Sequence, residues 1–499
     1  MSSAENSAVE NPPASAGGNS CPPQKLFCLC FAAVLVAGIA VRAWLYATTG
    51  FTVGDAFITF RFAEQFAAGN GLVFNAGEWF GGNTSVLHSF LLGLGACSGL
   101  DVPTVARIEG IVFDVAAFFV IWKMLGGTGG LRSPWLRLVP LALIFLCPFL
   151  FWYSISGLET PLYVALIFFV LERALRALDG LWLLGVALLF FCRPDGIVAV
   201  GIVLLFVTVL HRKLPWRAIA GVFAIGVAYL AFNFFVYHSL IPPTVKVKSL
   251  VYHCTVMSNV NYISGRFFFH RNWLLAAYLA VMLAMMFWRR KNPKVVLLGC
   301  AATGYLLFLL LAPMLRSWYA APFLALSAAT VLLAGFGLLE DFRPRLAGVL
   351  AATILAGYLA GCFVADRALQ KECGIWRQRI HDLTEAEGNW FKANTPGDTK
   401  ILVESLEVGW FSKRHTWDWP GLVSPPVLEL VKANPKIGFF EIAEKLKVNY
   451  VIIHNHWFAV DETNIPPNFE KVATFQSTKT GPVMDYGEGK DFIYQRLHD

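Results

Sequence analysis

The sequence predicts a polytopic α-helical membrane protein that ends in a small α/β domain. Two observations lead to this fold class. Of the 499 residues, 57% are hydrophobic and only 15% are charged, whereas about 25% of the residues of an average soluble protein are charged. In addition, apolar runs near the length of about 20 residues that a bilayer-spanning helix needs recur between residues 26 and 365.

We expect about 11 transmembrane helices, all within the domain formed by residues 26–365. Residues 1–25 are polar and rich in Pro, Gly and Ser, which predicts a disordered cytoplasmic N-terminus and no signal peptide. The two segments that flank Arg193 are short for a span. The expected spans are residues 26–46, 105–125, 136–153, 159–175, 180–192, 195–210, 217–237, 272–288, 294–313, 318–339 and 345–365.

The Lys and Arg residues of the short loops predict the orientation of these helices. With a cytoplasmic N-terminus every inward loop is basic, in agreement with the positive-inside rule. The C-terminus then lies outside the cytoplasm, and topology explains the net charge of +7 without a nucleic-acid partner. The basic residues of the inward loops are Lys123, Arg132, Arg137, Arg173, Arg176, Arg212, Lys213, Arg217, Arg289, Arg290, Lys291, Lys294, Arg343 and Arg345.

Three outward segments are long enough to hold structure: residues 47–104, 238–271 and 366–499. In the first extracytoplasmic loop, residues 55–68 and 85–100 predict two helices that lie along the membrane surface. The polar tail contains β-branched runs at Ile401–Glu404 and Asn449–Ile453, with a helical stretch at Glu441–Lys447. Its length of about 130 residues is enough for a small extracytoplasmic α/β domain.

The chain contains no Walker loop, dinucleotide fingerprint or His-x-x-x-His pattern. We therefore predict no cofactor and no metal site, although the sequence leaves a divalent metal open. His454 and His456 lie two apart after a predicted strand and are a conceivable metal pair. Because no third ligand is near them in the sequence, we favour a structural role for both.

The most informative stretch is Gly54-Asp55-Ala56-Phe57-Ile58-Thr59-Phe60-Arg61-Phe62, directly after the first apolar span. Charged side chains near hydrocarbon cost about 2.5–3.5 kcal/mol on insertion scales, so they are usually retained for a function. Asp55 is a candidate catalytic carboxylate, and a helix N-cap is the alternative. Arg61 is a candidate for orienting a substrate, although an ion pair with Glu64 across one helical turn is the simpler interpretation.

Further ionisable and aromatic residues gather at the outer ends of the expected spans. Glu159 follows one span, Arg193 and Asp195 interrupt another, and Arg316 precedes the interface pair Trp318 and Tyr319. In Ile241–Lys248, the alternating pattern predicts an extended segment with Lys246 and Lys248 on one side. Guanidinium and ammonium groups of this kind suit phosphate binding, whereas Arg193 has an ion pair with Asp195 as its simpler role.

Together these motifs resemble a bacterial GT-C glycosyltransferase family that includes the terminal arabinofuranosyltransferases of cell-wall arabinan. Residues 54–62 and 71–78 are similar to its first extracytoplasmic loop. Residues 156–160, 193–196 and 317–319 follow in the family's order, and residues 418–422 are similar to a recurrent stretch of its tail. The chain departs from the family pattern at Gly54, where the first of two adjacent acids is usual, and at residues 82–85.

The resemblance implies a bacterial inner-membrane enzyme that moves a sugar from a polyprenyl-phosphate donor to a glycan, lipid or protein acceptor at the outer membrane face. Asp55 would be the general base. The sugar and the stereochemical outcome stay open. The donor phosphate would be bound by Lys246, Lys248, Arg193 and Arg316; the substrate would be oriented by Arg61, Glu159, Asp195, Trp318 and Tyr319; and the acceptor would stack on Trp417 and Trp419, for which a role in the domain core is the more frequent alternative.

Two other classes compete with a glycosyltransferase. A transporter or flippase for lipid-linked sugars would place charges near the bilayer midplane and often shows related halves. Here the ionisable residues gather at the outer ends of spans and no repeat is evident, which favours chemistry at the surface. A non-catalytic assembly protein is the third class, and the missing acid at Gly54 is the argument for it.

Overall fold

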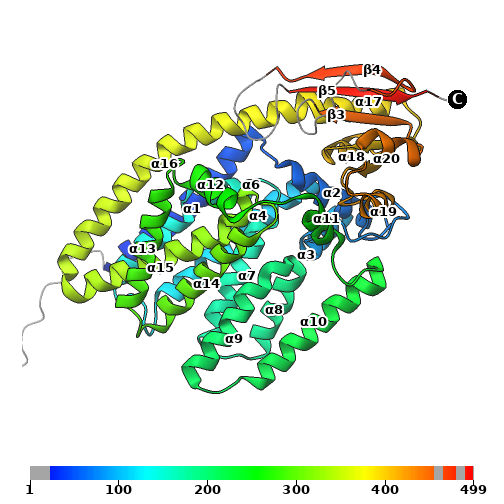
Figure 1. Cartoon of the computed structure of the whole chain (residues 1–499). Coiled ribbons are helices and arrows are strands. Elements are labelled where there is room, and N and C mark those ends of the chain that lie inside the picture. The colour runs from blue at the N-terminus through cyan, green and yellow to red at the C-terminus, as the bar shows by residue number, and fades with distance from the viewer. Residues whose placement is uncertain (1–22, 455–464, 479–488, 498–499) are drawn as a thin grey trace, which may run out of the picture.

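A computed structural model describes residues 23–454, 465–478 and 489–497. It consists of a helical body and a C-terminal α/β domain, connected by the long helix α16 (Figure 1). His456, one member of the histidine pair considered above, lies outside the described residues.

A helix covers each of the eleven segments predicted to span the membrane. The segment at 136–153 is divided into two helices that meet at an angle of 55°, because Pro148 begins a new helix and has no backbone N–H to continue the first. The helices are α1 (Pro23–Thr49), α4 (Val102–Leu125), α5 (Pro134–Phe145), α6 (Pro148–Ile155), α7 (Thr160–Ala174), α8 (Gly180–Cys192), α9 (Ile197–His211), α10 (Trp216–Tyr237), α13 (Asn272–Trp288), α14 (Pro293–Leu311), α15 (Ala321–Phe342) and α16 (Pro344–Ile380).

Five helices of the described residues are long and apolar enough to cross a membrane, and the number rises to seven if each of two bent helix pairs forms one span. The protein is therefore built for several membrane crossings. The shorter helices, such as α8 with 13 residues, do not pass this test. The expected total of eleven crossings stays a prediction.

Residues 47–104, the segment predicted to be the first extracytoplasmic loop, form two helices as expected, α2 (Gly54–Ala67) and α3 (Val86–Cys97); we call this segment the first loop. The predicted surface helix was expected to place its aromatic side chains against the membrane, and this part of the prediction is wrong. Phe57, Phe60 and Phe62 are buried within the protein, and α2 packs against α3 and against α18 (Glu407–Ser412) of the C-terminal domain. The hydrophobic face of α2 is thus covered by protein.

The second outward segment also differs from the prediction. Residues Pro243–Val251 form a helix, α11, which is followed by α12 (Val256–Phe267). Because Lys246 and Lys248 are two residues apart on a helix, their side chains point in different directions. The prediction of an extended segment with both lysines on one side is therefore wrong. Pro243 at the first helical position is the local signal for this helix.

The C-terminal domain is built on a five-stranded mixed sheet in the order β2-β1-β3-β5-β4. Strands β1 (Lys400–Val403), β2 (His415–Asp418) and β3 (Tyr450–His454) are parallel, while β5 (Lys490–Arg496) pairs antiparallel with β3 and with β4 (Phe469–Gln476). The predicted strands at 401–404 and 449–453 correspond to β1 and β3. The helices of the domain are α17 (Ala386–Asn394), α18, α19 (Pro425–Ala433) and α20 (Phe439–Lys445).

The two faces of this sheet have different coverings. On one face Leu402 and Val451 pack with residues of α19 and α20. On the other face Ile401 and Ile452 pack with Phe391 of α17 and with Phe62 and Phe74 of the first loop. This alternation is the period of two expected of strands, and it joins the C-terminal domain directly to the helix that carries Asp55.

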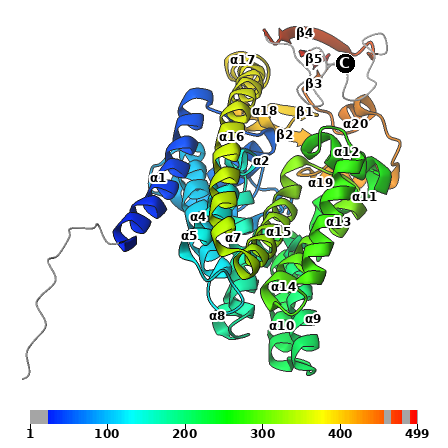
Figure 2. The ribbon, with the colours of Figure 1, turned by 90° about the vertical axis from the view of Figure 1, so that its left-hand side faces the viewer.

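Helix α16 runs without a break from the last predicted span into the C-terminal domain, and Figure 2 shows it along the length of the helical body. The expected boundary between residues 365 and 366 therefore falls inside a helix. A short π-helical segment, His381–Glu385, links α16 to α17. The continuous helix couples the domain mechanically to the membrane part.

Candidate active site

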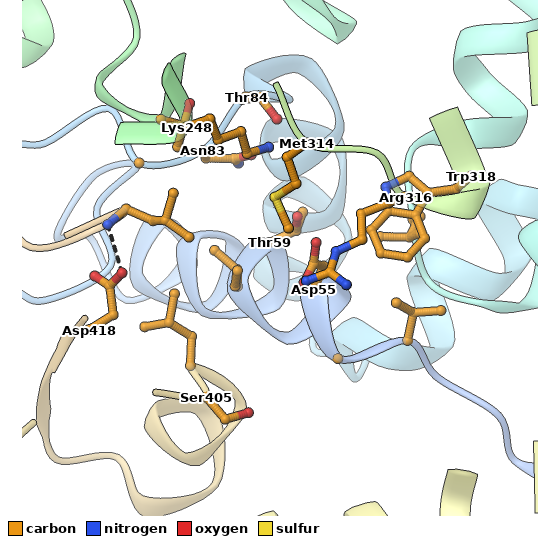
Figure 3. A pocket seen from close by; sticks show the side chains of 18 of the residues that line it. Asp55, Thr59, Asn83, Thr84, Lys248, Met314, Arg316, Trp318, Ser405 and Asp418 are labelled. Carbon is orange, nitrogen blue, oxygen red and sulfur yellow. Dashed lines mark hydrogen bonds between the residues drawn. The ribbon is translucent and has the colours of Figure 1, made fainter. Parts of the chain in front are cut away.

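A cavity of about 190 Å³ lies between the start of α2, helix α11, the segment before α15 and two loops of the C-terminal domain. We call it the active-site cavity. It brings together charged and aromatic residues that lie far apart in the sequence (Figure 3). Of the candidates named from the sequence, Asp55, Glu159, Arg193, Lys248, Arg316, Trp318, Tyr319 and Trp419 line it.

Asp55 is in the first turn of α2 and presents an exposed side chain to this cavity. Helix α2 begins after Val53, and no side chain caps its N-terminus. The alternative role of Asp55 as an N-cap is therefore wrong. Its carboxylate is left to face the cavity, where the positive end of the α2 dipole also favours a negative charge.

Two cations from other segments face the same space. Lys248 of α11 donates a hydrogen bond to the Tyr319 hydroxyl at 2.8 Å. Burial alone would lower the pKa of Lys248, but Tyr319 and Asp55 outweigh it and raise the pKa above its usual value. In Figure 3 the guanidinium of Arg316 extends toward Asp55. The cavity thus combines one first-loop carboxylate with two cationic groups.

Arg193 lines the cavity but is buried and held in an ionic network. Its Nη1 donates to Glu159 Oε1 at 2.9 Å and its Nε to Asp195 Oδ1 at 2.9 Å. The guanidinium also lies between the rings of Tyr163 and Tyr319, 5.0 and 4.7 Å from their centroids. Two carboxylates therefore already neutralise Arg193, which suits it to positioning Glu159 and Tyr319 more than to binding a phosphate.

A second carboxylate lies beside Asp55. Glu407 lines the cavity and accepts a hydrogen bond from Ser405 Oγ. It is buried, with 6% of its surface exposed. A Cβ atom added to Gly54 would lie 1.8 Å from Glu407 Oε1. Gly54 therefore leaves the space that the Glu407 carboxylate fills. Burial, together with the charge of Asp55, raises the pKa of Glu407.

The loop after β2 closes the cavity from the side of the C-terminal domain. Asp418 is buried and accepts backbone hydrogen bonds from Gly421, Leu422 and Val423, so it shapes this loop. Trp419 of the loop lines the cavity. Trp417 instead belongs to the core of the domain and donates its indole N–H to Glu78.

Three further candidates do not reach the cavity. Lys246 donates to Ser239 Oγ at 3.3 Å, Arg61 pairs with Glu64 at 2.9 Å as the simpler interpretation expected, and Asp195 contacts the site only through Arg193. Their assignments to phosphate binding and substrate orientation lack structural support. Sequence reasoning also missed Glu404, Ser405 and Glu407, because only the tertiary fold brings their loop to Asp55.

The helical body, with its first loop and C-terminal domain around an ionic cavity, has the GT-C fold, as comparison with solved structures shows. The chain superimposes on ArnT from Cupriavidus metallidurans bound to undecaprenyl phosphate, with a TM-score of 0.56 and 12% identity. The match covers 95% of this chain and 98% of the ArnT chain. The archaeal oligosaccharyltransferase AglB from Archaeoglobus fulgidus, in complex with an inhibitory peptide and a dolichol-phosphate, matches 85% of this chain and 69% of its own with a TM-score of 0.54 and 13% identity.

Sequence comparison points to the same class. The chain is 31% identical over 225 residues to a terminal β-(1→2)-arabinofuranosyltransferase of Mycobacterium tuberculosis, a match that covers 39% of this chain and 34% of the relative. The chain thus spans about a third of the length of that relative. Residues 374–493 match the family described as "Domain of unknown function (DUF8728)". The resemblance to GT-C glycosyltransferases read from the motifs is confirmed.

Proposed function

We propose that the protein is a membrane glycosyltransferase that transfers a sugar from a polyprenyl-phosphate donor to a cell-envelope glycan, lipid or protein acceptor. The observation that carries the proposal is the single cavity shared by Asp55, Lys248 and Arg316. The names of the relatives support it, because one is an arabinofuranosyltransferase and another is bound to undecaprenyl phosphate.

In this reaction the acceptor oxygen forms a bond to the anomeric carbon of the sugar. The bond from that carbon to the phosphate oxygen breaks, and its electron pair stays on the polyprenyl phosphate. Asp55 accepts the proton of the acceptor hydroxyl; such general base catalysis contributes typically about 10²–10⁴-fold. The leaving phosphate is already anionic, so it needs cations and no general acid.

Lys248 and Arg316 are the proposed phosphate ligands, because both line the cavity and their cationic groups suit a phosphate. Tyr319 and Glu159, held by Lys248 and Arg193, would orient the sugar together with Trp318. Trp419 is the proposed stacking surface for the acceptor, since it lines the cavity and Trp417 does not. Glu407 would supply the second carboxylate that the family pattern has at position 54.

The proposed membrane arrangement follows the basic loops. The N-terminus is cytoplasmic, about 11 helices cross the bacterial inner membrane, and the C-terminal domain lies outside. The cavity then opens at the outer face, where a polyprenyl-phosphate sugar and an envelope acceptor meet.

Release of polyprenyl phosphate from a panel of synthetic polyprenyl-phosphate sugars, by protein in lipid nanodiscs with candidate acceptors, tests the proposal. The wild type and Asp101→Asn should release it from the correct donor, and Asp55→Asn should not. Asp101 is a suitable control because it caps α4, outside the residues that line the cavity. If the wild type releases none while reconstituted vesicles show movement of the lipid-linked sugar across the membrane, a flippase replaces the proposal.

A further inference from the structure

A second group of ionisable side chains is buried in the C-terminal domain, behind the active-site cavity. Glu387, His454 and Asp491 each offer a ligand atom, and these atoms all lie within 4.8 Å of one another. The three residues are 0%, 4% and 2% exposed. With the neighbouring Glu404 and Glu407 we call them the C-terminal cluster.

Three elements bring the cluster together. His454 ends β3 and Asp491 is its direct partner in the antiparallel pairing with β5, where His454 Nδ1 lies 2.7 Å from Asp491 Oδ1. Glu387 comes from α17, directly after the π-helical segment. Segments of this kind occur frequently at functional sites. A ligand bound here would connect strands β3 and β5 of the sheet to helix α17.

Several carboxylate oxygens of the cluster accept no hydrogen bond in the part of the chain that the structure describes. Among the described residues, no N–H or hydroxyl group donates a hydrogen bond to either oxygen of Glu387, to Asp491 Oδ2 or to Glu404 Oε1. The carboxyl groups of Glu387 and Asp491 lie within hydrogen-bond reach of each other. Buried polar groups are nearly always hydrogen-bonded, so each exception needs an explanation such as an ion.

Basic side chains lie among these carboxylates. Glu387, Glu404, Glu407 and Asp491 all lie near His454, and Arg379 lines a small cavity with Glu407, His454 and Asp491. The site therefore offers carboxylate and imidazole ligands, with one guanidinium close by.

A small space adjoins two of the three proposed ligands. A cavity of about 20 Å³ is lined by Thr384, Arg379, Glu407, His454 and Asp491, whereas Glu387 is not among its lining residues. A volume of this size suffices for one water-sized particle. Imidazole with carboxylates is a ligand set for zinc and similar transition metals, whereas calcium and magnesium prefer oxygen ligands alone.

We propose that Glu387, His454 and Asp491 bind one divalent transition-metal ion, with Zn²⁺ as the best fit, which locks the C-terminal sheet onto α17. The ion displaces the imidazole proton of His454, because a metal-bound imidazole is neutral. Glu407 lines both this cavity and the active-site cavity, so the ion also steadies the loop behind Gly54 and Asp55. Metal binding does not depend on the proposed transferase activity.

The test measures the metal directly on the full chain in nanodiscs, after removal of any affinity tag. Elemental analysis of wild-type protein dialysed against Zn²⁺ should give about one ion per chain. Glu387→Gln and His454→Ala should bind Zn²⁺ at least tenfold more weakly. His415→Ala is the matched control, because His415 lies in the same domain but pairs with Glu78 of the first loop at 3.1 Å. This variant should leave zinc binding unchanged.

Thermal unfolding supplies a second readout that needs no variant. Chelator-treated wild type should unfold at a lower temperature and regain its stability with Zn²⁺ but not with Ca²⁺. Glu387→Gln should unfold at a temperature no lower than the chelator-treated wild type, since it removes a buried charge, and should not respond to Zn²⁺. A wild type that binds no stoichiometric Zn²⁺ and whose unfolding ignores it would overturn the proposal, as would equal loss of binding in His415→Ala.

Discussion

The active-site cavity and the C-terminal cluster use the same kinds of side chain in opposite surroundings. In the cavity, Asp55 is exposed, and Lys248 and Arg316 come to it from separate segments around a space of about 190 Å³. In the cluster, Glu387, His454 and Asp491 are almost completely buried, and a space of about 20 Å³ adjoins His454 and Asp491. Open, mixed charges suit a substrate that enters and leaves, whereas buried carboxylates beside an imidazole suit a permanently bound cation.

Glu407 connects the two regions, since it lines both spaces. Apart from this shared residue, a change at an exposed side chain of the cavity should lower turnover with little effect on folding. A change in a buried ionic network should first lower the stability of the protein. Experiments that separate turnover from unfolding test this comparison.

Replacement of Asp55 by Asn should have the largest effect on turnover. The amide keeps the shape of the side chain but cannot accept the hydroxyl proton, so kcat should fall about 10²–10⁴-fold. The unfolding temperature should stay within about 1 °C of the wild type, because Asp55 is exposed and surface changes of this kind cost little. Steady-state release of polyprenyl phosphate and thermal unfolding provide the two measurements; a stable variant with unchanged kcat would remove Asp55 from the mechanism.

Replacement of Arg193 by Met should instead act through stability. It leaves the buried carboxylate of Glu159 and the partly buried carboxylate of Asp195 without their cation, and breaking a buried ion pair costs about 3–5 kcal/mol. Thermal unfolding in nanodiscs should show the loss. Adding Glu159→Gln and Asp195→Asn should restore much of it, because the uncompensated charges are gone; no recovery would mean that packing between Tyr163 and Tyr319 dominates.

Replacement of Lys248 by Ala should weaken use of the donor by an intermediate amount. A hydrogen bond to a charged group contributes about 1.5–3 kcal/mol, which corresponds to a decrease in kcat/KM of about 10- to 150-fold. Lys246→Ala is the matched control, two residues away on α11 and outside the cavity, and should change kcat/KM less than about twofold. Equal losses in both variants would show that general positive charge matters, not position.

The helices were largely predictable because their signals are local. Apolar runs located a helix at each of eleven segments, and the polar loops between them gave boundaries within a few residues, except at the end of α16, which continues to Ile380. Eight of the candidate residues named from the sequence line the cavity. The prediction of secondary structure failed where the periodicity was ambiguous. Val245-Lys246-Val247-Lys248 alternates like a strand but is part of a helix that begins at Pro243.

The C-terminal cluster could not be predicted for a different reason. His454 and Asp491 meet only through strand pairing, and Glu387 joins them only because α17 packs near β3 and β5. The search for a third ligand close to His454 in the sequence therefore had no chance of success. Glu407 was missed in the same way, since its contact with Gly54 depends on docking of α18 onto α2.

The smallest effect is expected for Gly54→Ala, which tests the place where the two regions meet. Alanine is a better helix former than glycine by about 1 kcal/mol, so α2 itself should not be weakened. The new Cβ would lie 1.8 Å from Glu407 Oε1, and Glu407 must move. We expect kcat to fall several-fold with an unchanged KM for the donor.

Combining Gly54→Ala with Glu407→Ala separates the two possible causes of that loss. If the second carboxylate itself assists Asp55, the double variant should be as slow as Glu407→Ala alone, because the clash is relieved but the acid is still missing. If only the clash matters, the double variant should recover wild-type kcat. Gly201→Ala, where an added Cβ meets no atom within 4 Å, serves as the control for a Gly→Ala change in a helix, and full activity of Gly54→Ala would mean that the site tolerates displacement of Glu407.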